Sequence, residues 1–215
     1  MDGLLLPHDL LVKTGPVDFA DWNSRWVLGW IIRQRYSLAL SLFPQGPVGR
    51  LLEIGYGSGI FIPELTRHAR EVFGIDIHDC MNEVQRSLVK GGVSSPASLV
   101  QGSAEALPYE DRWFDLVVAI SALEFVPDVA AASRECARVL APGGMMLVVT
   151  PSSSQVADVG LRLLTGRDAE GDFEGRRQAV IPALLHHFTS DGTAYWPSGA
   201  LPLYRALRLR AQGPC

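Results

Sequence analysis

Between residues 50 and 150, the sequence alternates between short apolar segments and helical patterns. Buried strands are predicted at 51–54, 72–76, 99–100, 114–120 and 145–150. Helices are predicted between them, at 60–69, 81–89 and 129–140. Strands that alternate with helices pair in a mostly parallel sheet with helices on both faces, and right-handed crossovers make such a sheet doubly wound. The predicted fold class is therefore α/β, with a doubly wound, mostly parallel sheet.

The segment before this core has its own helical pattern. Apolar residues recur at helical spacing from Trp22 to Phe43, and Asp21 is a candidate N-cap. We expect one long helix, or two helices broken near Gly29, preceded by an irregular arm.

The segment after the core has a weaker pattern. We expect helices at 156–164 and 178–188, a polar loop at 166–175, and a single convincing strand at 203–209. The chain then divides into an arm with a cap helix (1–47), an α/β core (48–151), and C-terminal helices with a terminal strand of the same domain (152–215).

The composition argues against several classes of protein. The formal charge is −4, and residues 50–150 hold 8 basic and 13 acidic side chains. Nucleic acid is not expected as a partner, because phosphate binding needs a broad basic surface. The three cysteines lie far apart, without a CxxC motif or a nearby histidine, so neither a disulfide framework nor a metal site is expected.

The same observations bear on location. We see no signal-peptide pattern and no run of 18 apolar residues, so we expect no membrane span and a cytoplasmic protein. Arginines such as Arg35 and Arg208 gather near both ends of the chain. They could contact an anionic ligand or lipid, although solvated side chains are the favoured interpretation.

A glycine-rich loop follows the first predicted strand, in the segment Glu53-Ile54-Gly55-Tyr56-Gly57-Ser58-Gly59. Glycines permit positive φ angles and let a ligand approach bare backbone, and the next helix points its amides at the same place. A dinucleotide fingerprint would need a small residue where Ile60 stands. A nicotinamide cofactor is therefore disfavoured, while a purely structural turn remains an alternative.

Two further polar sites follow the next strands. Asp76 closes the second strand, where a carboxylate can accept both hydroxyls of a ribose. The cluster from Gly102 to Pro108 follows the third strand and offers polar atoms to the edge of a base.

These motifs together resemble the class I S-adenosylmethionine-dependent methyltransferases. The resemblance covers about residues 48–151 and rests on four motifs in the family's order: 51–59, 73–76, 101–115 and 138–144. It implies a Rossmann-like methyltransferase fold with an N-terminal helical cap, and S-adenosylmethionine as the cofactor.

The resemblance also implies which residues hold that cofactor. The methionine part would contact Glu53, Gly55, Gly57 and Gly59, with Tyr56 in the same loop. The ribose would bind Asp76, and the adenine would lie against Ile77, Ser103 and the amide of Ala104, with Ser121 nearby. The family often has Asp at the position of Ser103, so a hydroxyl replaces a carboxylate in this chain.

A catalytic side chain is harder to predict, because methyl transfer needs a base only if the acceptor must lose a proton. Glu124 follows the fourth strand and could act as that base, or could be an ordinary acid near a helix N-terminus. His186 and His187 are weaker candidates, since neighbouring residues point to different faces of a helix.

The N-terminal helix carries Trp22, Trp26 and Trp30. They could simply pack the helix onto the domain, cover an apolar acceptor as the resemblance implies, or make peripheral membrane contact. The predicted function is methyl transfer to a small apolar or amphipathic acceptor, such as a lipid, a quinone or a natural-product intermediate. The alternatives are a catalytically silent cofactor-binding scaffold and a nicotinamide-dependent oxidoreductase. The oligomeric state is not predicted.

Overall fold

The structure is a computed structural model, and it describes residues 4–15, 26–93, 97–152, 176–199 and 201–212. The predicted N-cap at Asp21, the helix at 156–164 and the loop at 166–175 lie outside these residues.

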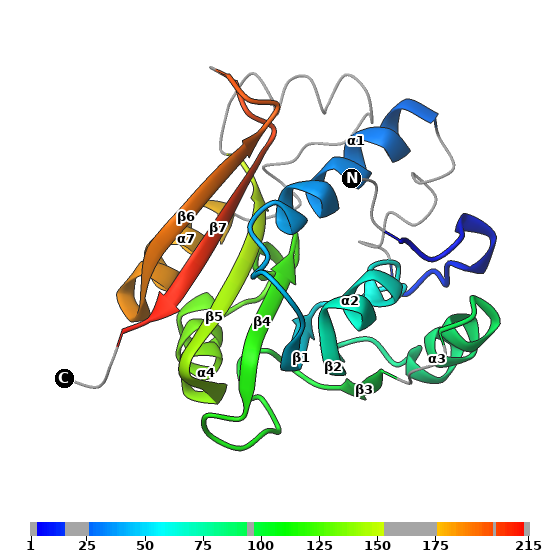
Figure 1. Ribbon diagram of the computed structural model, residues 1–215, viewed down its shortest axis with the longest axis horizontal. Helices are drawn as coiled ribbons and strands as arrows, with labels where there is room; N and C mark the ends of the chain where they lie inside the picture. Colours follow the sequence, from blue (N-terminus) through cyan, green and yellow to red (C-terminus); the bar gives the residue numbers. More distant parts are fainter. Residues whose placement is uncertain (1–3, 16–25, 94–96, 153–175, 200, 213–215) are drawn as a thin grey trace.

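One seven-stranded sheet runs through the molecule, in the order β3-β2-β1-β4-β5-β7-β6 (Figure 1). The strands are β1 (Val48–Ile54), β2 (Ala69–Asp76), β3 (Ser98–Gln101), β4 (Phe114–Ile120), β5 (Leu140–Pro151), β6 (Phe188–Trp196) and β7 (Tyr204–Ala211). The first five strands are parallel, whereas β7 runs antiparallel to both of its neighbours. The predicted doubly wound, mostly parallel sheet is confirmed.

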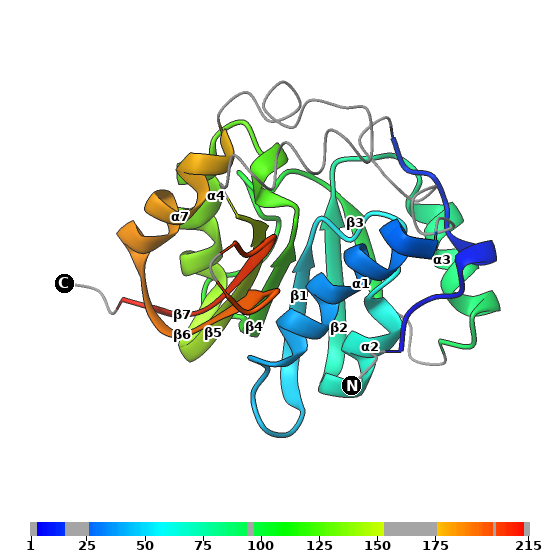
Figure 2. The same cartoon turned by 90° about the horizontal axis from the view of Figure 1, so that it is seen from above.

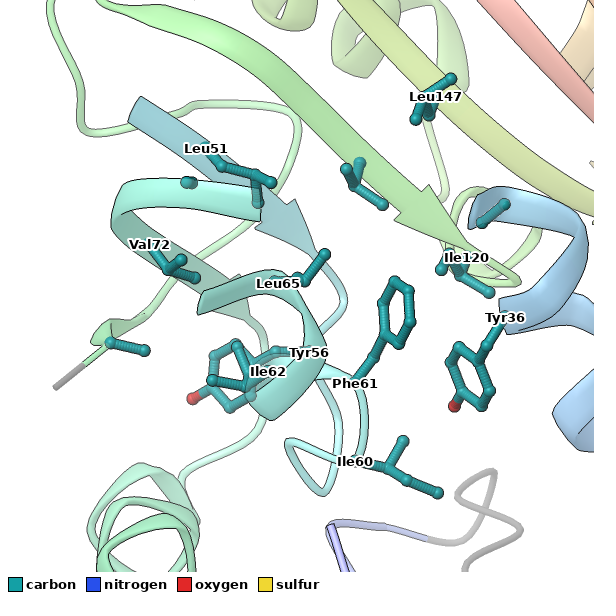
Figure 3. Packing of buried hydrophobic residues seen from close by; sticks show 14 of the residues in the cluster. Tyr36, Leu51, Tyr56, Ile60, Phe61, Ile62, Leu65, Val72, Ile120 and Leu147 are labelled. Carbon is teal, nitrogen blue, oxygen red and sulfur yellow. The ribbon is translucent and has the colours of Figure 1, made fainter. Parts of the chain in front are cut away.

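Helices cover both faces of this sheet (Figure 2). They are the short η1 (His8–Leu10) and η3 (Leu123–Phe125), with α1 (Trp26–Leu40), α2 (Ile62–His68), α3 (Met81–Lys90), α4 (Val129–Val139) and α7 (Arg176–His187). One core joins α1 and α2 to the sheet, and Figure 3 shows Tyr36 of α1 beside Phe61, where the two rings stack at 4.8 Å. The second core lies beneath α4 and α7, around Cys136 and Leu184. The described part of α1 is continuous through Gly29, so no break occurs there.

The C-terminal part of the sheet differs from the prediction. We expected one strand, at 203–209, and the structure adds β6 beside it. Strand β6 lies at the edge of the sheet, and most of its residues are exposed or half-buried. Its polar sequence therefore resembles a loop, because only backbone pairing with β7 makes it a strand.

The N-terminal arm lies against α2 and α3. Leu6 is fully buried, and its backbone N–H donates to the carbonyl of Ile60. The Leu4 N–H donates to the buried carboxylate of Glu64 at 2.7 Å. Within the described ranges, no helix is long and apolar enough to cross a membrane.

The strand order places a ligand site in the sheet. From β1 the chain first adds β2 and β3 on one side, and then β4 and β5 on the other. At this reversal the loops after β1 and β4 diverge, and open α/β sheets bind ligands there, at the carboxyl ends of the strands.

Candidate functional site

The glycine loop after β1 uses its three glycines for different reasons. Gly55, Gly57 and Gly59 all have positive φ, at 73°, 49° and 73°. A Cβ on Gly55 would lie 2.4 Å from the Cβ of Ala122, and a Cβ on Gly59 would lie 2.8 Å from Val84 Cγ1. Protein packing therefore requires these two glycines. A Cβ on Gly57 would meet nothing within 4 Å, so at this position the missing side chain leaves open space.

Asp76, at the end of β2, is bonded directly to this loop. Its Oδ2 accepts a hydrogen bond from the Gly57 N–H at 2.8 Å, and its Oδ1 accepts from the Ile77 N–H at 2.7 Å. Two residues that the sequence assigned to one ligand thus lie side by side. Ile77 is 74% exposed and leaves an apolar surface beside the carboxylate.

His78 is a part of this site that the sequence did not identify. The Cys80 N–H donates to His78 Nδ1 at 3.1 Å. Nδ1 is therefore the acceptor, and Nε2 carries the proton that it donates to the Gly57 carbonyl at 3.1 Å. His78 and Asp76 hold the two backbone groups of Gly57 from the same side, so the conformation of the loop depends on both. Sequence alone offered no signal for this, because the contact joins residues 21 apart.

Tyr56 points away from the open side of the loop. Its side chain is buried, packs edge-on against the His78 ring at 4.9 Å, and would meet a Cβ placed on Gly74. Burial first, and then Asp76, raises the pKa of its hydroxyl above the usual value. The Tyr56 hydroxyl is buried and has no hydrogen-bond partner among the described residues.

The segment after β3 is organised by a turn. Ser103 Oγ accepts the Glu105 N–H at 3.2 Å and donates to Glu105 Oε2 at 3.1 Å. Glu105 in turn accepts the Asp128 N–H through Oε1 at 2.6 Å, which ties this turn to the start of α4. Ala104 is buried within the turn. The Ser103 hydroxyl is thus engaged locally.

Ser121 and Glu53 bring unpartnered polar atoms to the same edge. Ser121 follows β4 with a φ of 51°, which is uncommon for a residue with a side chain, and its buried Oγ has no hydrogen-bond partner in the part of the chain that the structure describes. Glu53 lies one residue before the end of β1 and is 4% exposed, and its Oε2 has no hydrogen-bond partner among the described residues. Burial raises the pKa of Glu53 to about 8, with Asp76 adding to the shift and Arg35 opposing it. Orphaned buried groups of this kind are costly and point to a ligand site.

Glu124 is the most enclosed acid of the site. It lies in η3, is 1% exposed, and has no hydrogen-bond partner for either carboxylate oxygen among the described residues. Burial raises the pKa of Glu124 to about 7, against the opposing effect of its own backbone amide and of Arg35 and Arg177. A carboxyl group with a pKa near neutrality can both accept and return a proton.

Arg35 is the second residue that the sequence missed. It lies in α1, donates from Nη2 to the Tyr36 hydroxyl at 3.0 Å, and keeps a buried Nε without a partner. Burial works against its charge, but Tyr36, Tyr204 and Glu124 together raise its pKa, so it stays positive. The interpretation of Arg35 as a solvated arginine is wrong, because the fold of α1 onto the sheet encloses it.

Other candidates do not belong to this site. Arg208 and Arg210 both pair with Asp191, at 2.7 and 3.0 Å, which accounts for these cations of the C-terminal segment. His187 directly precedes β6, whose first residue pairs with the end of β7. It therefore lies at the amino edge of β5, opposite the edge that carries Glu124 and Asp76.

A family model described as a methyltransferase domain matches residues 52–148. A ubiquinone/menaquinone biosynthesis C-methyltransferase, UbiE from Shewanella oneidensis, is 36% identical over 126 residues, which are 57% of this chain and 49% of that protein. The chain thus spans about half the length of the curated relatives that it matches.

Solved structures share the fold. The PH0226 protein from Pyrococcus horikoshii aligns with a TM-score of 0.67 and 18% identity, covering 89% of this chain and 94% of that chain. The N-methyltransferase NodS from Bradyrhizobium japonicum, in complex with S-adenosylhomocysteine, aligns with a TM-score of 0.65 and 20% identity, covering 93% and 94%.

Proposed function

We propose that this chain is a class I S-adenosylmethionine-dependent methyltransferase that transfers a methyl group to a small apolar or amphipathic acceptor, because a methyltransferase-domain model matches residues 52–148 and a C-methyltransferase is 36% identical over 126 residues. The cofactor of the family is S-adenosylmethionine. The observation that carries the proposal is Gly57, the one glycine of its loop that faces open space, held beside the Asp76 carboxylate at 2.8 Å.

The residues around Gly57 fit this cofactor. Asp76 would accept the ribose hydroxyls, and the exposed Ile77 would lie against the adenine. Glu53, a buried acid with an unpartnered oxygen, would face the cationic methionine end, whose charge would favour its ionised form. A ligand that bonds the unpartnered atoms of Glu53 and Ser121 would remove the cost of their burial.

Catalysis in this proposal depends mainly on placement. The bound cofactor supplies an electrophilic methyl group on a sulfonium centre. The chain contributes an enclosed site, which excludes water and aligns the acceptor. Glu124 would take a proton from an acceptor hydroxyl, since its carboxylate is enclosed and has no competing hydrogen bond.

The acceptor we favour is a quinone-type ring in its reduced state. The Shewanella relative is named as a quinone-biosynthesis C-methyltransferase, and it is 36% identical to this chain over 126 residues. Helix α1 supports an apolar acceptor, because Trp30 is 57% exposed and contacts Trp196 edge-on at 5.3 Å. Peripheral membrane contact through α1 stays a prediction.

Calorimetry with S-adenosylhomocysteine and with NAD tests the cofactor. We expect binding of the first and none of the second, and preferential NAD binding would favour an oxidoreductase instead. Methyl transfer from labelled S-adenosylmethionine to reduced 1,4-naphthoquinone tests the acceptor class. Cofactor binding without turnover on this and other apolar phenols would support the scaffold alternative.

A further inference from the structure

Four polar residues from four elements meet at the carboxyl edge of the sheet, and we call them the edge cluster: Arg35 of α1, Glu124 of η3, Arg177 of α7 and Tyr204 of β7. Strand pairing places Tyr204 opposite Pro151, at the carboxyl end of β5. Arg177 donates to the carbonyls of Pro151 and Ser152 at the same place. Arg177 and Tyr204 thus lie at the end of β5, beside the end of β4 that leads to Glu124.

The opposite charges of this cluster do not pair directly. The carboxylate of Glu124 is buried, yet it makes no hydrogen bond or ion pair with Arg35. Arg176 Nε donates to the Glu124 backbone carbonyl at 3.4 Å, and not to its carboxylate. Arg35 Nε is also buried and unpartnered, although Nη2 is bonded to Tyr36. A buried carboxylate and a buried guanidinium nitrogen that stay apart lose the stabilisation of an ion pair, and unpartnered buried groups of this kind point to a ligand.

The Arg35 side chain is held by Tyr36 through a cation–π contact and a hydrogen bond. The guanidinium lies over the Tyr36 ring at 4.9 Å, and Tyr36 itself is stacked on Phe61. Because the Tyr36 ring is fixed in the core, Arg35 is held in place before any ligand arrives. Its unpartnered Nε–H is therefore preorganised rather than flexible.

We infer that Arg35 and Glu124 form one subsite, which binds an acidic hydroxyl of the acceptor, such as a phenol, between a guanidinium and a carboxylate. This inference rests on the proposed function and deepens it. The acceptor O–H bond breaks, the proton goes to a Glu124 oxygen, and the electron pair stays on the acceptor oxygen as a hydrogen-bonded partner of Arg35. The methyl acceptor is thereby made electron-rich, with no other reactant needed.

This arrangement predicts that ligand binding takes up a proton. Above the pKa of about 7 of Glu124, both its carboxylate and an acidic phenol are ionised before they meet. The two oxygens can then share the subsite only if one proton enters with the ligand. The charged groups near Glu124 are Arg35, Arg176 and Arg177, the neutral Tyr204 hydroxyl lies beside them, and Glu53 interacts with Arg35 from β1.

The test uses 4-nitro-1-naphthol, an apolar phenol whose anion is coloured, titrated into the full chain saturated with S-adenosylhomocysteine. Calorimetry in two buffers of different ionisation enthalpy measures the proton uptake. Wild type should take up about one proton at alkaline pH, so its affinity should fall about tenfold per pH unit. Glu124→Gln should take up none and keep a constant affinity.

Arg35→Met should bind the naphtholate roughly 10- to 100-fold more weakly, the range for a hydrogen bond to a charged group, and Arg35→Lys should recover part of this loss. Arg33→Met is the matched control, because Arg33 is an exposed residue of the same helix, and its affinity should match that of wild type. If the wild-type protein does not bind S-adenosylhomocysteine, the proposed function itself is overturned. Three results would overturn only the subsite, provided that the cofactor binds normally. They are no naphtholate binding by wild type, the same naphtholate affinity in Arg35→Met as in wild type, and the same proton uptake in Glu124→Gln as in wild type.

Discussion

Substitution of Gly57 by alanine tests whether the glycine loop binds the cofactor or is only a structural turn. The backbone at Gly57 has a φ of 49°, so an alanine there carries the strain of a left-handed conformation, about 1–2 kcal/mol. A Cβ at this position meets no protein atom within 4 Å, so no clash adds to that strain. Gly57→Ala should therefore stay folded and lose only a small part of its stability.

Two matched variants isolate the effect. Gly46 also has a positive φ, of 84°, and open space around it, but lies before β1 at the opposite edge of the sheet. Gly46→Ala should thus show the strain alone. Gly59→Ala adds a contact of 2.8 Å with Val84 Cγ1, and overpacking of this kind adds about 1–3 kcal/mol to the strain. The expected order of stability loss is Gly59→Ala first, with the other two smaller and equal.

Cofactor affinity should follow a different order. If S-adenosylhomocysteine lies against Gly57, the added methyl group overpacks the complex, and a penalty of about 1–3 kcal/mol corresponds to roughly 5- to 100-fold weaker binding. Gly46→Ala should bind as wild type does. Calorimetry gives the affinity, and urea denaturation gives the free energy of unfolding. A Gly57→Ala protein that binds with wild-type affinity would refute the reasoning and leave the loop as a structural turn.

Three other predictions follow from the same contacts. Asp76→Asn should weaken S-adenosylhomocysteine binding by about 1.5–3 kcal/mol, the range for hydrogen bonds to a charged group, and unchanged affinity in calorimetry would remove Asp76 from the site. His78→Phe should also weaken S-adenosylhomocysteine binding, because the Gly57 carbonyl loses its hydrogen-bond donor, and His78→Gln should recover part of the loss. Equal affinities for wild type, His78→Phe and His78→Gln would contradict this positioning role. The folded state of wild type binds the Glu124 proton up to a pKa of about 7, against about 4.5 when unfolded, so this group makes stability fall as pH rises through that window. Glu124→Gln should therefore gain roughly 3 kcal/mol relative to wild type between pH 4.5 and 7 in urea denaturation, and a stability difference that does not change with pH would show that Glu124 is not buried as an acid.

The sequence alone was sufficient for the order of the core elements. Strand β4 was predicted at 114–120 and is found there, because the short apolar run from Leu116 to Ile120 is rich in β-branched residues and is typical of a buried parallel strand. The glycine loop and Asp76 were also predictable, since both follow strands of a parallel sheet and must meet at its carboxyl edge. These are local patterns joined by one topological rule.

The tertiary structure decided which side chains share the site and which leave it. From the sequence, Arg35 was interpreted as a surface arginine. In the structure, α1 packs on the sheet and encloses Arg35 near Glu124, which lies 89 positions later in the chain. Tyr56 lies inside the motif, yet its ring turns into the core beside Gly74. Strand β6 forms through antiparallel backbone pairing with β7. In each case the deciding energy comes from burial and from pairing between distant segments, which local periodicity and composition do not encode.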